Sequence, residues 1–90
     1  MPLKLCRHKL FKKDVAKAKM TDVQYAKLIR YIALLLEEKT LPEESRDHGL
    51  KGEWQGYREF HLGGDLLLIY LVEGDSLILV RLGTHSQLFE

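Results

Sequence analysis

Cysteine, proline and long apolar runs are all scarce in this chain of 90 residues. The single cysteine, Cys6, can form no internal disulfide and has no CxxC partner for a zinc site, which favours a reducing environment. We expect its side chain to be buried, because free cysteines behave as small hydrophobic residues. The longest uninterrupted apolar run, 66–72, is far shorter than the ~20 residues that a bilayer-spanning helix needs, and the first residues lack the apolar stretch of a signal peptide. These absences predict a cytoplasmic protein that does not bind membranes.

The length and the charge distribution restrict the protein further. A chain of 90 residues has room for one core, so we expect residues 1–90 to form a single domain. Hydrophobic residues make up 46% and charged residues 30%, which is typical of a folded protein. The net charge of +1 hides an asymmetry, because residues 1–20 carry a charge of +6 and the remainder a charge of −5. Such a basic segment indicates an anionic partner, although a solvated helix face explains it equally well.

Two helices are predicted in the first half of the chain. After a weak strand at 3–7, apolar residues at helical spacing indicate an amphipathic helix over 9–19. Residues 21–24 read Thr-Asp-Val-Gln, a capping box that predicts the start of a second helix, over 22–38. The turn between the two helices is short, so they should form an antiparallel hairpin. The buried stripe of the second helix is expected to comprise Tyr25, Leu28, Ile29, Ile32, Leu35 and Leu36.

The second half of the chain predicts strands. Segments 57–62, 65–72 and 77–82 are rich in apolar residues, and the middle one is continuous enough for a central strand covered on both faces. Residues 43–47 read as a loop and residues 84–90 as a short tail. Helices followed by strands predict an α+β domain, in which a strand and a two-helix hairpin precede a twisted, mostly antiparallel sheet of three or more strands.

Three of the four histidines lie in loops or at the ends of predicted strands, where a rigid scaffold presents functional side chains. These are His48, His61 and His85. Histidine donates and accepts protons near neutral pH. A structural role is commoner for any one histidine, but three of them, with Asp65 and Arg81 in the same predicted sheet, indicate a functional site.

Two chemistries use such a set of residues. Metal-assisted hydrolysis would take the three histidines and Asp65 as ligands, but their spacings of 13 and 24 residues fit no zinc motif, and we expect neither metal nor other cofactor. Metal-free cleavage of RNA needs a base for the ribose 2′-OH, an acid for the departing 5′-oxygen and a cation for the charged phosphorane. Because the nucleophile is the 2′-OH, that reaction is specific to RNA.

The segment 47–61 has the form D-H-x-L-x-G-x-W-x-G-Y-R-x-x-H, and it resembles the YafQ family of bacterial toxins within the RelE/ParE superfamily. So many fixed positions are more specific than a single short motif. Residues 1–46 match the family only in the layout of their elements. The similarity continues through Asp65 and 68–70, and it closes with 81–85 and 88–89.

The resemblance implies a fold, an activity and partners. The family is a small α+β domain with two N-terminal helices on a twisted antiparallel sheet. Its members are toxins of type II toxin–antitoxin systems that cut mRNA in the ribosomal A site without a metal. The implied partners are mRNA, the ribosome and a cognate antitoxin of the DinJ kind.

Carried over position by position, the resemblance also implies the site. Its catalytic residues are His48, His61, Asp65 and His85. We expect His61 and His85 to form the acid–base pair, either one serving as the base, while His48 and Asp65 orient them or share the proton transfers. The substrate-binding residues are Arg81, which suits phosphate, Phe89, which stacks on a base or anchors packing, and Arg58, which contacts RNA or forms a salt bridge. The family often has tryptophan where this chain has Leu66.

A non-catalytic binding module is the alternative. It would be a ParE-like protein that acts on gyrase, or a decayed toxin that only sequesters antitoxin. ParE-type proteins lack this set of histidines, which disfavours the alternative.

Overall fold

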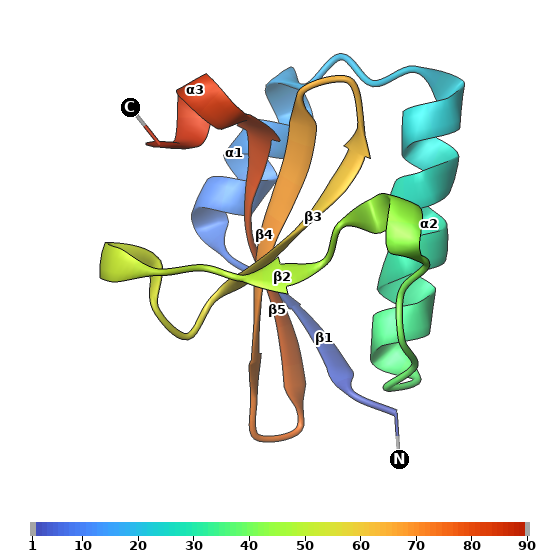
Figure 1. The fold of residues 1–90 in the computed structure, drawn as a ribbon, viewed down its shortest axis with the longest axis vertical. Coiled ribbons are helices and arrows are strands. Elements are labelled where there is room, and N and C mark those ends of the chain that lie inside the picture. The colour runs from blue at the N-terminus through green and yellow to red at the C-terminus, as the bar shows by residue number, and fades with distance from the viewer. Residues whose placement is uncertain (1, 90) are drawn as a thin grey trace.

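The computed structural model describes residues 2–89, which form an α+β fold as the sequence predicts (Figure 1). One mixed sheet has the strand order β1-β5-β4-β3-β2, in which only the pairing of β1 with β5 is parallel. The elements in chain order are β1 (Lys4–Arg7), α1 (Lys9–Lys17), α2 (Asp22–Leu36), η1 (Glu43–Ser45), β2 (His48–Gly49), η2 (Gly52–Trp54), β3 (Arg58–Gly63), β4 (Leu66–Glu73), β5 (Ser76–Thr84) and α3 (His85–Phe89), where η marks a short 3-10 helix.

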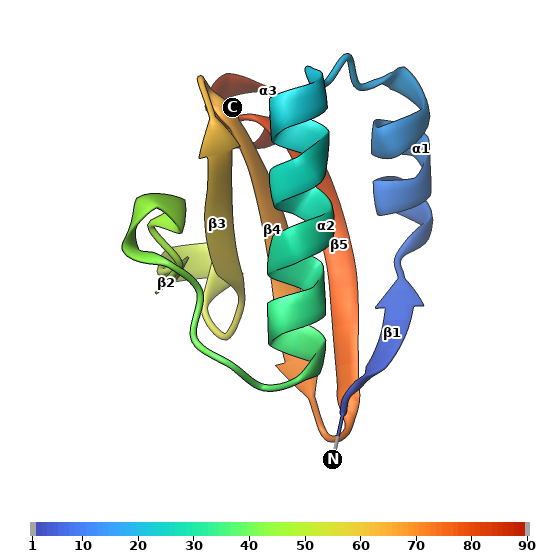
Figure 2. The same ribbon diagram turned by 90° about the vertical axis from the view of Figure 1, so that its right-hand side faces the viewer.

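The two long helices run in opposite directions beside the sheet (Figure 2). The predicted capping box of α2 is confirmed, because the Gln24 amide donates to Oγ1 of Thr21 (3.1 Å) and the Thr21 amide donates to Oε1 of Gln24 (3.0 Å). The helix ends two residues earlier than expected, and Glu38 then adopts a φ of +58° that turns the chain away.

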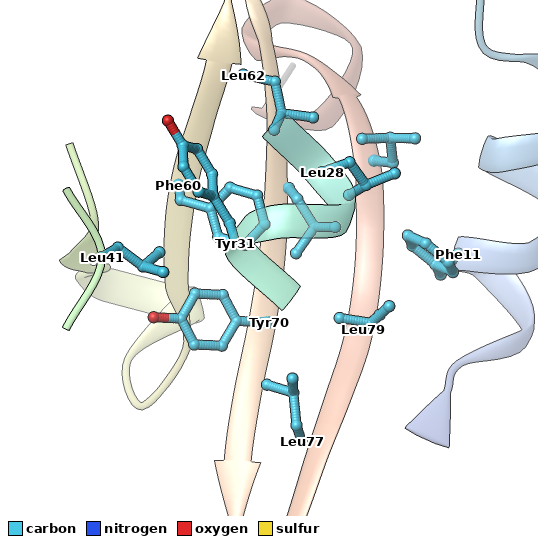
Figure 3. Packing of buried hydrophobic residues seen from close by; sticks show 11 residues of the cluster. Phe11, Leu28, Tyr31, Leu41, Phe60, Leu62, Tyr70, Leu77 and Leu79 are labelled. Carbon is cyan, nitrogen blue, oxygen red and sulfur yellow. The ribbon is translucent and has the colours of Figure 1, made fainter. Parts of the chain in front are cut away.

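The predicted buried stripe of α2 is partly wrong. Tyr25 and Ile29 are 54% and 56% exposed, whereas Leu28 and Tyr31 are buried. The helix carries more apolar residues than its contact with the sheet can cover, and that contact selects the face that meets β3. There the ring of Tyr31 packs edge-on against Phe60, with the ring centroids 5.4 Å apart (Figure 3).

Strand β4 is covered on both faces, as its apolar run predicts. Leu68 and Tyr70 point into the core beneath α2, while Leu67 and Ile69 belong to a second apolar cluster on the opposite face. Full burial of a side chain of this size stabilises the fold by roughly 1.5–3 kcal/mol. The centre of the sheet is therefore packed on both faces, and the face opposite to the helices also has an apolar cluster beneath its exposed side chains.

Three further expectations differ from the structure. Cys6 is exposed rather than buried, because it lies in the exposed edge strand β1. His48 lies in the two-residue strand β2 and not in a loop, and the expected tail forms the short helix α3.

Among residues 2–89, no helix is both long enough and apolar enough to cross a bilayer.

Candidate active site

The register of the sheet places three of the predicted site residues, His48, His61 and Arg81, on one face. Glu59 and Arg81 are both paired with Ile69, and His48 is paired with Glu59, so these positions form one row across four strands. Side chains alternate between faces along a strand. Phe60 points into the core beneath the helices, so the side chains on either side of it, from Glu59 and His61, point to the opposite face.

The carboxylate of Glu59 joins two of the predicted histidines. Its Oε2 lies 3.0 Å from Nε2 of His61 and 3.4 Å from Nε2 of His48. The two imidazoles are stacked, with ring centroids 6.1 Å apart and planes inclined by 22°. Glu59 is only 3% exposed, whereas His48 is exposed and His61 is half-buried. The two imidazoles are therefore accessible to solvent, whereas the Glu59 carboxylate that they contact is buried.

The hydrogen bonds of His48 determine where its protons lie. Its Nδ1 is 2.6 Å from the carbonyl oxygen of Arg46, and a carbonyl oxygen can only accept, so Nδ1 carries a hydrogen. Its Nε2 lies 3.4 Å from the Glu59 carboxylate, which is an ion pair when the ring carries a second proton. The cluster of His48, Glu59 and His61 is thus built to share protons, which is what acid–base catalysis needs.

The third predicted histidine, His85, follows the end of β5, which β4 separates from β3. It is the exposed first residue of α3, and its ring packs against Phe89 with the centroids 4.7 Å apart. Phe89 also packs against Trp54 (5.9 Å) and against the apolar cluster of Leu67 and Ile69. His85 therefore shares a sheet face with the Glu59 cluster.

The separation between the two parts follows from the register. His61 and Gly83 are both paired with Leu67, one from β3 and the other from β5. Two strand spacings put their backbones roughly 10 Å apart. His85 follows two residues after Gly83, so the strands that carry His61 and His85 flank β4.

Helix α3 is fixed to the end of β5 by a close approach and a local cap. The Thr84 amide donates to Oε1 of Gln87 (2.8 Å), and the Gln87 amide donates to Oγ1 of Thr84 (3.3 Å). A Cβ atom on Gly83 would lie 2.9 Å from Oε1 of Gln87 and 3.3 Å from Cδ2 of Leu88. Glycine at this position lets the helix pack tightly and so holds His85 in place.

The predicted phosphate ligand Arg81 is held by an acidic partner. It donates from Nε (2.7 Å) and Nη2 (3.2 Å) to the carboxylate of Asp14 in α1, which also accepts from the amide of Leu82 (3.0 Å). Burial raises the pKa of Asp14, but the bonds from Arg81 and Leu82 outweigh burial and lower it below its ordinary value. The guanidinium keeps further N–H donors for a second anion.

The other predicted arginine, Arg58, does not join the histidines, because it shares a strand face with Phe60 and contacts Tyr70 on the helix side of the sheet. It links β2 to the sheet. Asp47 accepts from Nε of Arg58 (3.3 Å) and from the hydroxyl of the buried Tyr70. Burial, with the hydrogen bond to Asp47, raises the pKa of Tyr70 above its ordinary value, so this hydroxyl remains a donor. Because Asp47 precedes His48, these bonds position the two-residue strand that carries His48.

Asp65 lies apart from the histidine cluster. It is exposed in the tight turn between β3 and β4, and the neighbouring Leu66 packs toward the helix side of the sheet. The ligand atoms that lie within 4.8 Å of one another come from His48, Glu59 and His61, and two imidazoles and a carboxylate are a donor set that can hold a transition-metal ion. Asp65 and His85, which the sequence offered as ligands, are outside that group of three.

Glu59 is the one member of the cluster that our sequence analysis missed. A signal for it exists in the sequence, because in a strand over 57–62 every second residue shares a face, so Glu59 must lie beside His61. A charged residue among apolar ones on a buried face indicates a pairing partner.

Comparisons with known proteins identify the family of this chain. Residues 3–90 match the family described as "Bacterial toxin of type II toxin-antitoxin system, YafQ". The mRNA interferase toxin YafQ of Escherichia coli K12 is 40% identical over 81 residues, which cover 88% of this chain and 87% of that protein. A copper-bound mutant toxin from Helicobacter pylori has a TM-score of 0.88 at 42% identity and covers 97% of this chain and 99% of that one. A chain of the E. coli DinJ–YafQ toxin–antitoxin complex has a TM-score of 0.85 at 33% identity and covers 100% of both chains. The chain therefore belongs to the YafQ family of bacterial toxins.

Proposed function

We propose that this protein is the toxin of a type II toxin–antitoxin system and an endoribonuclease that cuts mRNA on the ribosome. Residues 1–90 act as a single toxin domain in the cytoplasm. The observation that carries the proposal is the proton-sharing cluster of His48, Glu59 and His61, which faces the same side of the sheet as His85. The E. coli relative is named an mRNA interferase, which is the activity that this arrangement of imidazoles supports.

The proposed reaction uses two histidines, His61 from β3 and His85 from the end of β5, as base and acid. One of His61 and His85 removes the proton of a ribose 2′-OH, whose oxygen attacks the adjacent phosphorus. The bond from phosphorus to the 5′-oxygen breaks, and the other histidine gives that oxygen a proton. The products carry a 2′,3′-cyclic phosphate and a 5′-hydroxyl. Glu59 accepts protons from its neighbouring imidazoles and orients both rings.

The remaining residues bind and position the substrate. The free N–H groups of Arg81 stabilise the charge that develops on the phosphorane. Phe89, held between His85 and Trp54, offers a ring on which a base can stack. His48 and Asp65 assist the proton transfers, His48 through Glu59 and Asp65 from the turn after β3. Arg58 acts through Asp47, whose bonds position the strand that carries His48.

An antitoxin is the expected partner. One relative has been crystallised as a DinJ–YafQ complex, and a chain of that complex covers this chain from end to end. We therefore propose a cognate antitoxin of the DinJ kind, which binds this protein and blocks cleavage.

The second candidate function is metal-dependent hydrolysis, in which the histidine cluster binds a metal ion. Two observations favour it: His48, Glu59 and His61 offer converging ligand atoms, and the H. pylori relative is described as copper-bound. A bound divalent ion would polarise a phosphate oxygen or activate a water molecule. In that case the imidazoles would act as ligands and would not be available to transfer protons.

The experiment that tests the proposal follows cleavage of a defined mRNA on purified ribosomes. We expect His61→Ala and His85→Ala each to lower the rate by 10²- to 10⁴-fold, the usual contribution of an acid–base group. His8→Ala is the matched control. His8 caps α1 away from the site, so this variant keeps the wild-type rate. Full activity in both site variants would contradict the proposal.

Two further arms separate the alternatives. A chelator selective for transition-metal ions leaves the magnesium of the ribosome in place, and the proposal predicts unchanged cleavage in its presence. Loss of cleavage that copper or zinc restores would support the metal site instead. A wild-type protein that binds antitoxin and cleaves no mRNA would be a binding module only.

A further inference from the structure

A cavity of about 480 Å³ lies outside the histidine cluster, between α1, the end of β5 and α3. This volume is within the range that small-molecule sites occupy. Figure 1 shows α1 and α3 at the same end of β5. The basic and polar residues that line the cavity are Lys17, Lys19, Arg81, Thr84 and Gln87, and Asp14 is the one acidic residue in the lining.

The charge of the lining favours an anion. Two lysines and one arginine face the cavity against a single carboxylate. Asp14 is already occupied by the guanidinium of Arg81 and the amide of Leu82. Lys17 and Lys19 are therefore left with an uncompensated charge of +2, and both side chains are exposed.

The opposite part of the lining is apolar. Ala18, Leu66, Leu82 and Leu88 contribute to it. Apolar carbon beside cationic groups matches a nucleotide, whose base offers an aromatic face and whose phosphate is charged. A free inorganic anion would leave the apolar wall unused.

The cavity is connected to the catalytic side of the sheet by the backbone. Thr84 lines the cavity, and His85 follows it directly in the chain. Arg81 lines the cavity and also lies in the row of Glu59. We propose that this cavity is a subsite that holds the nucleotide next to the cleaved linkage, with its phosphate on Lys17 and Lys19 and its base against Leu66 and Ala18. The proposal rests on the ribonuclease function proposed above and assigns one part of its substrate.

The test uses the full chain and a short RNA in which every 2′-oxygen is methylated, so that binding is measured without cleavage. In the NMR spectrum of the wild-type protein, the amides of Ala18, Leu66 and Thr84 should shift on titration. We expect the double variant Lys17→Gln/Lys19→Gln to weaken binding by at least about tenfold, and to lower the slope of log affinity against log salt by about 1.4, which is 0.7 for each lost phosphate contact.

The matched control is Lys12→Gln/Lys13→Gln, which removes the same charge from α1 outside the cavity. It should weaken binding by less than about threefold, the general effect of lost positive charge. Equal losses in the two double variants, or no shifts at Ala18, Leu66 and Thr84, would overturn the subsite.

A failure of the subsite can be told apart from a failure of the ribonuclease proposal. On titration with the methylated RNA, His85→Ala should still shift the amides of Ala18 and Leu66, while it cuts mRNA 10²- to 10⁴-fold more slowly than the wild type. If the wild-type protein shifts at the cavity but cleaves no mRNA, the cavity binds RNA and it is the ribonuclease proposal that fails. If the wild-type protein cleaves mRNA but its amides at the cavity do not shift, the ribonuclease proposal is supported and the subsite is wrong.

Discussion

The carboxylate of Glu59 is enclosed by its neighbours and contacts two imidazoles at once. A buried charge is stable only when it is paired and hydrogen-bonded. Here the pairing partners, His48 and His61, are the same groups that the proposed reaction needs. A single side chain thus supports both the local fold and the chemistry.

Glu59→Gln tests that dual role. Glutamine keeps the volume and one acceptor but cannot accept a proton, so we expect cleavage to fall by about 10²-fold. The free energy of unfolding should change by no more than about 1–3 kcal/mol, the cost of an altered buried hydrogen bond. Glu53→Gln is the control, because Glu53 is exposed in η2. Equal rates for the two variants in the ribosome assay would remove Glu59 from the mechanism.

Helix α3 is a short element whose position depends on the strand before it. Its cap, formed by Thr84 and Gln87, repeats the pattern of Thr21 and Gln24 in α2. The sequence therefore contains the signal for this helix, and reading residues 84–90 as a tail overlooked it. Helix α1, the capping box and the central strand β4 could all be predicted, because their signals are local.

Strand β2 could not be predicted from local signals. It has only two residues, and its place depends on bonds from Asp47 to Arg58 and Tyr70, which lie 11 and 23 positions away in the chain. The site could be predicted only in part, because it also depends on contacts between residues that are distant in the chain. Motif resemblance identified the histidines, but the pairing of Arg81 with Asp14 spans 67 positions and is visible only in the fold.

Gly83→Ala tests the placement of α3. The added Cβ would crowd Gln87 and Leu88, so we expect the helix to shift, with a loss of about 1–3 kcal/mol in the free energy of unfolding. A shift of about 1 Å in His85 should lower the cleavage rate by up to 10²-fold. Gly49→Ala is the matched control, because its Cβ would meet Arg58 at an ordinary 3.6 Å. Wild-type cleavage by Gly83→Ala would show that α3 does not depend on this packing.

Across the whole molecule, the basic N-terminal segment and the sheet are joined through Asp14. Strand β1 pairs with residues 76–79 of β5 only, and beyond that point the carboxylate of Asp14 accepts the amide of Leu82. Helix α1 thus covers the free upper edge of β5. Its other lysines, Lys9, Lys12 and Lys13, are exposed, which is compatible with both interpretations of the charge asymmetry, an anionic partner and a solvated helix face.

The Asp14 contacts predict a pH dependence of stability. The pKa of Asp14 is lowered in the folded state, so its contribution is present above its ordinary pKa of 3.8 and is lost as the pH falls through the folded value. Asp14→Asn should therefore be less stable than the wild type by about 1–3 kcal/mol at pH 7, and the two should converge at strongly acidic pH. Urea unfolding at several pH values measures this. Asp75→Asn, at an exposed ion pair with Lys4, is the control and should show little change. A constant gap between the wild type and Asp14→Asn down to strongly acidic pH would contradict the assignment.

The most direct test of the mechanism examines the RNA ends that this protein makes on ribosomes. An mRNA with ordinary ribose at the cut position should yield a 2′,3′-cyclic phosphate and a 5′-hydroxyl, because the imidazoles activate the 2′-OH and not a water molecule. The same mRNA with a single 2′-deoxy substitution at that position should not be cut. Cleavage of the deoxy-substituted mRNA, or products that carry a 5′-phosphate and a 3′-hydroxyl, would contradict the account.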